Sequence, residues 1–357
     1  MRSTIKKSVH IIMLSSLVMM IVFSMPSVIL AQSEFSFSVE PIFSENQIQE
    51  TTSYFDLNIE PGESETFGIL LNNFTNQPVE VEISAYTAYT NVNGVVEYGR
   101  DPEEMNPTIP HALGDLLTTP GIVTIPSGSS IEAPIKITMP EESFTGLLAG
   151  GLRIEEVKDD NTPKEEGLAI ENAFSYIIGV IASNNRAPVI PDLELLDVFA
   201  SQLNYRNVFS ATLQNYTPTF INQLEVEAEI RAAGQEEVLY EAQNSGMQMA
   251  PNSHFDFPIP LEGERFQAGD YVLTMVARSG EYEWSWEYEF TVDAQEARQF
   301  NRQDVEIDSG ISVWIIILIG FIILLVAIII YLLLKQKNKL SKEISTSKGE
   351  GDYEEKA

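Results

Sequence analysis

Short alternations of apolar and polar residues fill most of the chain between Phe35 and Val292. Apolar residues occupy every second position in segment 55–59, and segments 79–83 and 224–230 repeat the pattern. Pro, Gly and Asn separate these segments, and no helical period runs through them. Such alternation is typical of antiparallel strands that bury one face. We therefore predict an all-β fold built from antiparallel β-sandwiches.

One sequence element occurs twice. Leu-Asn-Asn-Phe-Thr at 71–75 precedes the run VEVEI, and Leu-Gln-Asn-Tyr-Thr at 213–217 precedes LEVEAEI. A repeated strand, loop and strand indicates two related units, and the stretch 184–191 between them has the composition of a linker. We predict two immunoglobulin-like β-sandwich domains, at residues 35–183 and 192–294.

Residues 311–334 are apolar and carry no charged side chain. A helix of this length, at about 1.5 Å per residue, crosses the roughly 30 Å hydrocarbon core of a bilayer. Acidic residues precede the segment and basic residues follow it, namely Asp304, Glu306 and Asp308, then Lys335, Lys337, Lys339 and Lys342. This asymmetry predicts a single-pass membrane protein with the N-terminus outside and residues 335–357 as a cytoplasmic tail. Residues 295–310 would form a stalk before the transmembrane helix, and Ala294 to Arg302, at its start, is a candidate short helix.

The N-terminal segment has the features of an export signal. Arg2, Lys6 and Lys7 precede an apolar run at 9–23, and the sequence VILAQS offers a cleavage position after Ala31. We expect residues 1–31 to be a signal peptide. An uncleaved signal anchor is the alternative.

Acidic residues dominate the charge of the chain. It contains 52 acidic and 21 basic residues, which gives a formal net charge of −31. Such a surface repels polyanions, so we exclude nucleic acid as a partner. The chain also contains no cysteine. This fits proteins exported by Gram-positive bacteria, and it leaves stability to burial alone.

Catalytic chemistry has little support in the sequence. A Cys/His site is impossible without cysteine, and only His111 and His254, outside the signal segment, could serve a Ser/His/Asp site. The acidic loops 101–104 and 159–161 lack the ligand spacing of calcium-binding loops. We therefore expect no catalytic residue, no cofactor and no metal site. An envelope enzyme that cleaves glycans with two carboxylates is the alternative.

Two stretches contain candidate binding residues. Asn93-Gly94 has the signature of a two-residue type I′ hairpin, and the first candidates are Tyr89, Asn91 and Asn93 at this hairpin. The Pro-rich stretch 101–119 that follows is too long for a simple turn. We interpret it as a loop that offers a contact surface.

Four aromatic residues occupy alternate positions of one predicted strand, at Trp284, Trp286, Tyr288 and Phe290. They would share one face, and a sandwich needs such a face for its core, so core packing is favoured. A docking surface is the alternative, which makes Trp284 and Trp286 the second set of candidate binding residues.

Glycines are concentrated in the segment FTGLLAGGLRIEE, at Gly146, Gly150 and Gly151. Glycine inside a strand pattern indicates a bulge or the close approach of another backbone. We predict one of these features here.

Several segments, taken in order, resemble one protein family. They are FSFSVEPIFSENQ, TSYFDLNIEPGESETF, TNVNGVVEY, MPEESFTGLLAGGL, MQMAPNSHFDFPIPLEG, AGDY and WSWEYEF. Together they are similar to the WxL-interacting proteins of Gram-positive bacteria, over about Phe35 to Leu334. The resemblance implies a peptidoglycan-binding first domain, an immunoglobulin-like second domain that binds host proteins, and partnership with surface proteins that carry a Trp-x-Leu motif. The chain has no such motif itself, so it would be the interacting partner.

These observations predict a non-catalytic scaffold or adhesin anchored in the cell membrane, with its ectodomain in the cell wall. It would link WxL-type surface proteins to peptidoglycan and bind host extracellular-matrix proteins. A membrane-anchored sensor or regulator is a further alternative. Exposed edge strands offer one general docking mode, β-augmentation, but the sequence does not identify the edge.

Overall fold

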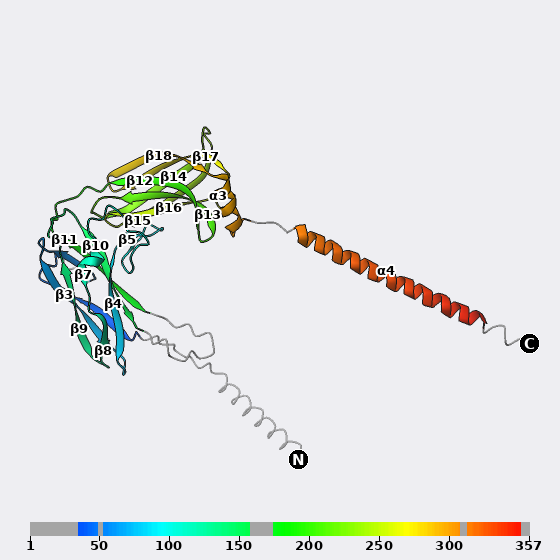
Figure 1. Cartoon of the computed structure of the whole chain (residues 1–357), viewed down its shortest axis with the longest axis horizontal. Helices are drawn as coiled ribbons and strands as arrows, with labels where there is room; N and C mark the ends of the chain where they lie inside the picture. Colours follow the sequence, from blue (N-terminus) through cyan, green and yellow to red (C-terminus); the bar gives the residue numbers. More distant parts are fainter. Residues whose placement is uncertain (1–34, 49–52, 158–173, 308–312, 351–357) are drawn as a thin grey trace, which may run out of the picture. The chain divides into compact units, whose positions relative to one another are not determined.

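The computed structural model describes residues 35–48, 53–157, 174–307 and 313–350. These residues form two compact units, each built around a β-sandwich, and a long C-terminal helix (Figure 1). The predicted all-β, immunoglobulin-like class with one C-terminal apolar helix is therefore confirmed. The predicted signal peptide, residues 1–31, lies outside the described residues.

The first unit comprises Met1–Ala88, Tyr98–Pro102 and His111–Ala187, as far as these are described. Its two sheets have the strand orders β1-β3-β9-β7 and β2-β11-β10-β4-β8, and only β2 and β11 pair in parallel. The elements are β1 (Phe37–Ile42), β2 (Phe55–Asn58), β3 (Ser64–Asn73), β4 (Val79–Thr87), α2 (Leu113–Leu116), β7 (Leu117–Thr118), β8 (Gly121–Ile125), β9 (Ser130–Thr138), β10 (Leu148–Glu156) and β11 (Ser175–Ser183).

The core of the first unit lies between these two sheets. Alternate residues such as Ile69 and Leu71 in β3 meet Val81 and Ile83 in β4, and all four are almost fully buried. Residues 184–187, from the predicted linker, also belong to this unit. The Asn184 side chain accepts a hydrogen bond from the Phe144 amide and donates one to the Glu142 carbonyl.

The second unit contains Tyr89–Glu97, Glu103–Pro110 and the chain from Pro188 onward. Its sandwich has sheets in the orders β12-β13-β16 and β15-β14-β17-β18, and a separate hairpin pairs β5 with β6. The strands are β5 (Tyr89–Thr90), β6 (Val96–Glu97), β12 (Leu193–Leu203), β13 (Arg206–Asn215), β14 (Ile221–Ala232), β15 (Val238–Met249), β16 (Ser253–Pro260), β17 (Gly269–Ser279) and β18 (Tyr282–Val292).

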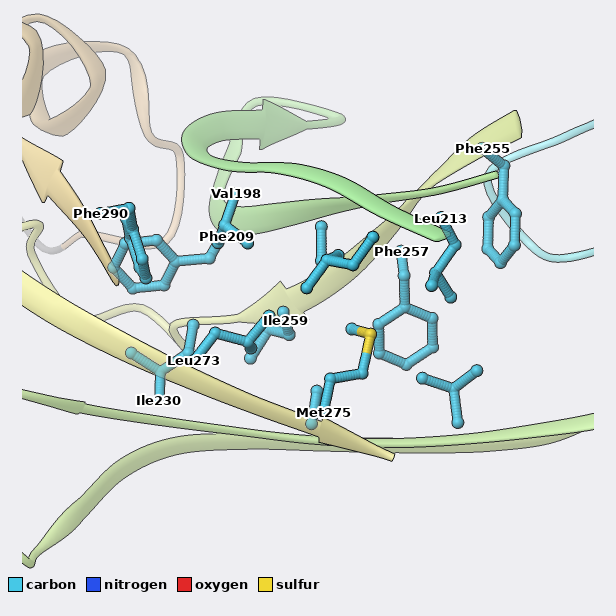
Figure 2. Packing of buried hydrophobic residues seen from close by; sticks show 14 of the residues in the cluster. Val198, Phe209, Leu213, Ile230, Phe255, Phe257, Ile259, Leu273, Met275 and Phe290 are labelled. Carbon is cyan, nitrogen blue, oxygen red and sulfur yellow. The ribbon is translucent and has the colours of Figure 1, made fainter. Parts of the chain in front are cut away.

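Aromatic and aliphatic side chains from both sheets fill the core of the second unit (Figure 2). Phe209 is fully buried, and its ring centroid lies 5.1 Å from that of Phe266 and 5.3 Å from that of Phe290. In β14 the predicted alternation is confirmed, because Leu224, Val226, Ala228 and Ile230 are buried. The glutamates between them point away from the core.

The repeated sequence element is one structural corner used twice. Asn73 and Asn215 each end a strand and are almost fully buried. The Asn73 amide donates to the carbonyls of Gln77 (2.8 Å) and Ile125 (3.0 Å), and Asn215 donates to those of Thr219 and Ala250 (both 2.8 Å). In each corner the amide oxygen accepts from the backbone and hydroxyl of the threonine two residues later. The corners satisfy backbone groups that the strand ladders leave unpaired.

The segment predicted as a stalk begins with a helix that packs on the second unit. Residues Ala294–Gln303 form helix α3, in which Ala297 is buried in the core of the second unit. The Asn301 side chain exchanges hydrogen bonds with the backbone of Phe266, and Asp304 accepts one from the Asn207 amide at 2.6 Å. An apolar stripe of Ala297 and Phe300 packs this helix on the sandwich.

Helix α4 spans Val313–Glu350. Its stretch Ile317–Lys335 is long and apolar enough to cross a membrane, and none of it is buried in protein. The helix continues past Lys335 into the segment predicted as a cytoplasmic tail. The structure thus provides a candidate membrane anchor where the hydrophobic pattern predicts one.

The Asn215→Ala substitution should destabilise the second unit strongly. It removes the bond to the Thr219 carbonyl and one of two bonds to the Ala250 carbonyl, which also accepts from the Ser253 hydroxyl. A hydrogen bond lost at a buried group costs about 1–3 kcal/mol. Urea unfolding of the full chain in detergent micelles measures the loss, with exposed Gln235→Ala as the control. A variant as stable as the control would contradict a structural role for the corner.

Candidate functional site

A row of tyrosines and glycines crosses the outer face of the five-stranded sheet in the first unit. Gly179 in β11 pairs with Gly151 in β10, which pairs in turn with Tyr86 in β4. Tyr54 precedes β2, and its side chain lies 3.5 Å from the position that a Cβ of Gly179 would take. The two glycines therefore form a flat floor with a tyrosine at each end.

Tyr98 lies on this floor. A Cβ on Gly151 would come within 2.5 Å of the Tyr98 carbonyl oxygen and 2.7 Å of its Cβ. Only glycine at 151 allows this approach, which confirms the prediction that the glycines of this segment admit another backbone. We call Tyr54, Tyr86, Tyr98, Gly151 and Gly179 the tyrosine platform.

The phenol of Tyr98 stays neutral well beyond physiological pH. Burial raises the pKa of Tyr98 above its usual value, and the neighbouring Tyr54 raises it further. A neutral phenol keeps its hydroxyl as both donor and acceptor of hydrogen bonds. The platform therefore combines flat rings with uncharged polar groups.

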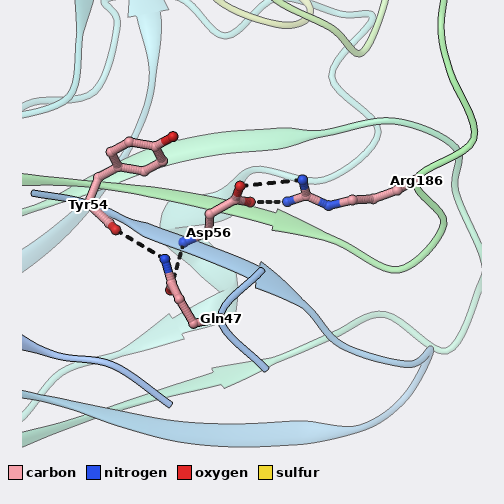
Figure 3. Close-up of polar contacts among 4 residues, drawn as sticks. All are labelled: Gln47, Tyr54, Asp56 and Arg186. Atoms are coloured by element: carbon pink, nitrogen blue, oxygen red, sulfur yellow. Dashed lines mark hydrogen bonds and ion pairs between the residues drawn. The ribbon is translucent and has the colours of Figure 1, made fainter. Parts of the chain in front are cut away.

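A buried ion pair holds the strand next to Tyr54 (Figure 3). Asp56 is 3% exposed and pairs with Arg186. The Asp56 amide donates to Gln47 Oε1 at 3.0 Å, and Gln47 Nε2 donates to the Tyr54 carbonyl at 3.4 Å. The Gln47 side chain thus holds the backbone on both sides of Phe55 and positions Tyr54, while Arg186 holds the Asp56 carboxylate.

The hairpin predicted to bind is folded into the second unit. Tyr89 opens β5, and Asn91 begins the loop that leads to β6. The Asn91 carboxamide oxygen accepts from the amides of Asn93 (2.9 Å) and Val95 (3.2 Å), and its nitrogen donates to Glu97 (2.8 Å). Asn91 therefore shapes the hairpin, whereas Asn93 is exposed at its tip.

The predicted type I′ turn is wrong. That turn needs positive φ at both central residues, but in this hairpin Gly94 has φ 67° and Asn93 is outside the positive region. The Asn91 amide donates a hydrogen bond to the Val95 carbonyl at 2.9 Å, so the loop consists of the three residues 92–94. The asparagine side chain stabilises this longer loop, with glycine in the left-handed position.

The hairpin and the following loop contact β15 and β16 inside the second unit. The Gln248 amide donates to the Gly94 carbonyl at 2.8 Å, and the Ala250 amide donates to the buried hydroxyl of Thr90 at 3.0 Å. In the predicted contact loop 101–119, Asn106 is buried against His254, with 2.9 Å between Nδ2 and Nδ1. Asn106 therefore ties segment 103–110 to the second unit, whereas most residues of this segment are exposed.

The aromatic residues of β18 pack against the core. Phe290 is buried, and Trp284, Trp286 and Tyr288 are partly buried against the core cluster. Trp284 Nε1 donates to Asp192 at 2.8 Å, and the Tyr288 hydroxyl donates to Asp197 at 3.2 Å. These contacts agree with the favoured core interpretation, and a binding role for Trp284 and Trp286 stays a prediction.

The second unit also has a groove of about 770 Å³. Edge strands β15 and β16 form its two sides, and the β12–β13 turn forms one end. The lining residues are Leu203, Asn204, Arg206, Asn207, Val208, Ala242, Gln243, Asn244, Phe257, Pro258, Pro260, Glu262 and Glu306. We call this the edge groove.

Sequence reasoning missed both the platform and the groove. The glycines of FTGLLAGGLRIEE signalled a close approach, but not that Tyr98 makes it. For the groove, Pro258 and Pro260 in one strand pattern were an available sign of a sheet edge. Within the described residues no group of three His, Cys, Asp or Glu could hold a metal ion.

Two family models match the chain in tandem. Residues 37–156 match the peptidoglycan binding domain of the WxL Interacting Protein family, and residues 165–302 match its host binding domain. The chain belongs to this family. The second match begins before β11, which pairs with β10 in the first unit. A comparison with curated proteins finds no match.

Among solved structures, the chain is similar to pilus chaperones at low identity. The class 5 fimbriae chaperone CfaA is 12% identical, with 72% of this chain and 99% of that chain covered and a TM-score of 0.29. The chaperone–adhesin complex CsuC–CsuE of Acinetobacter baumannii is 14% identical, with coverage of 71% and 98% and a TM-score of 0.33. Likeness at this level carries no argument about ligands.

The hydrogen bonds of Asp192 predict a pH-dependent stability. The bond from Tyr216, and after it the bond from Trp284, hold the pKa of Asp192 below its usual value. A lowered pKa stabilises the fold above the unfolded value of about 3.9, and the contribution is lost as pH falls through the folded pKa. Asp192→Asn should therefore lower the melting temperature at pH 7 by more than at pH 3. An equal reduction at both pH values, measured by calorimetry, would contradict this account.

Proposed function

We propose that the protein is a non-catalytic scaffold that links WxL-type surface proteins to peptidoglycan and binds host extracellular-matrix proteins. One observation carries the proposal: a peptidoglycan binding domain and a host binding domain match in tandem, ahead of an apolar helix. Two binding domains on one anchored chain supply the two ends of a link. The family name supports the WxL partner.

Membrane attachment would make this link effective at modest affinity. The basic residues after Lys335 and the acidic residues before residue 311 support an orientation with both units outside the membrane. A chain held at the membrane meets the wall at a high effective concentration, so several weak contacts act together. Such avidity suits a scaffold better than one tight site.

We place the peptidoglycan contact on the tyrosine platform. Tyr54, Tyr98 and Gly151 lie within the segment that matches the peptidoglycan binding domain. Flat rings beside uncharged hydroxyls suit the faces and polar edges of amino-sugar rings. No acid–base pair is needed, because the role is retention rather than cleavage.

The double substitution Tyr54→Leu and Tyr98→Leu should weaken binding to purified peptidoglycan. Leucine keeps apolar bulk but removes the flat ring and the hydroxyl. At about 1 kcal/mol for each ring, we expect roughly a tenfold loss or more in co-sedimentation of the full chain in detergent. Tyr205→Ala, which removes a 70% exposed ring from the second unit, should have no effect.

A melting curve of each variant verifies that the fold survives. Retention of the folded double variant at the wild-type level would remove the platform from the proposal. Failure of the wild-type chain itself to bind peptidoglycan would contradict the scaffold function.

A further inference from the structure

The two sides of the edge groove differ in their capacity to pair with another strand. β15 and β16 are each the terminal strand of their sheet. β16 carries Pro258 and Pro260, which have no backbone N–H and are tolerated where that group would face away from the ladder. β15 has no proline. The prolines hinder the pairing of another strand with the edge of β16, whereas the edge of β15 can accept a strand.

The available part of β15 is short and well defined. Residues Tyr240–Asn244 pair in continuous register with β14, between irregularities next to Val238 and at Gly246, whose φ is 73°. Beyond Gly246 the edge of β15 already bonds the β5–β6 hairpin, because the Gln248 amide donates to the Gly94 carbonyl. The stretch from Tyr240 to Asn244 therefore lies open along the groove.

The lining of the edge groove favours a partner segment that carries an apolar side chain between basic side chains. Leu203, Ala242 and Pro258, which are partly exposed, supply apolar surface beside the open edge. Glu262 and Glu306 stand in the lining, and Glu241 is exposed on β15. Arg206 is the one basic residue of the lining, and it pairs with Glu306 at 2.5 Å. The groove therefore has a net negative rim around an apolar interior.

We propose that the edge groove binds an extended segment of a partner protein, with alternating apolar side chains and basic flanks, as an added strand on β15. Backbone bonds to Tyr240–Asn244 would supply affinity, and an apolar side chain against Leu203 and Pro258 would supply specificity. A second copy of this chain fits poorly, because antiparallel pairing of two 240–244 segments would bring the two copies of the exposed Glu241 close together.

The inference rests on the proposed function only in assigning protein binding to the second unit. Its test is independent of peptidoglycan, so the two proposals fail separately. The probe is a labelled synthetic peptide, Lys-Thr-Val-Thr-Val-Thr-Lys, titrated by fluorescence anisotropy against the full chain in detergent micelles. The reference peptide has glutamate in place of both lysines.

Glu262→Lys should weaken binding of the lysine-flanked peptide about tenfold and strengthen that of the glutamate-flanked one, since rim charges set partner preference. The matched control is Glu287→Lys, which makes the same charge change on exposed β18 and should leave both affinities unchanged. Equal effects of the two substitutions would show that only net charge matters, and would overturn the proposal.

Hydrogen exchange of the same complex locates the added strand. We expect slower exchange in segment 238–246 when the peptide binds, and no change in β18. Proline substitutions at Glu241 and at Ala242 complement this, because adjacent residues of a strand turn their N–H groups to opposite edges. One of these two variants removes an N–H group that points to the open edge of β15. That variant should stay folded but no longer bind the peptide.

Three results would overturn the proposal. The first is the absence of peptide binding to the wild-type chain, and the second is protection confined to other strands. The third is protection of segment 238–246 that rises with protein concentration without peptide, which would identify a second copy as the occupant.

Discussion

Burial between paired sheets is the constraint on which the whole structure depends, because the chain has no cysteine to cross-link its strands. Each sandwich places alternate apolar residues of two sheets face to face. Where the strands end, backbone groups lose their ladder partners, and the buried side chains of Asn73 and Asn215 replace them. The same corner therefore satisfies the unpaired backbone groups at a strand end in each unit.

Glycine and proline shape the two surfaces that we propose as binding sites. At Gly151 and Gly179 the missing side chains leave a floor on which Tyr98 lies. At Pro258 and Pro260 the missing N–H groups leave one side of the edge groove unable to pair. In both places a backbone property, rather than a reactive side chain, sets the chemistry available. Retention of extended or flat ligands follows more naturally from such surfaces than turnover does.

Features that depend on the local alternation of residues can be predicted from the sequence. Contacts that depend on the pairing of strands far apart in the sequence cannot. The alternation in β14 and the repeated asparagine element were readable because their neighbours lie close in sequence. The meeting of Tyr98 with Gly151 depends on the pairing of β10 with β11 and β4, which no local pattern encodes. A short helix at residues 294–302 could be expected from the sequence, but its packing on the sandwich could not, because only Ala297 and Phe300 form its buried stripe. The hairpin was misjudged because the Asn91 side chain stabilises a longer loop than Asn93-Gly94 alone suggests.

The central claim is that one chain holds a surface protein and the wall together. A three-component co-sedimentation tests it most directly, with purified peptidoglycan, a protein carrying Trp-x-Leu motifs and the full chain in detergent. The account predicts that adding the chain increases the amount of the Trp-x-Leu protein recovered with peptidoglycan, in proportion to the chain bound. Recovery that does not change when the chain is added, although the chain itself sediments, would contradict it.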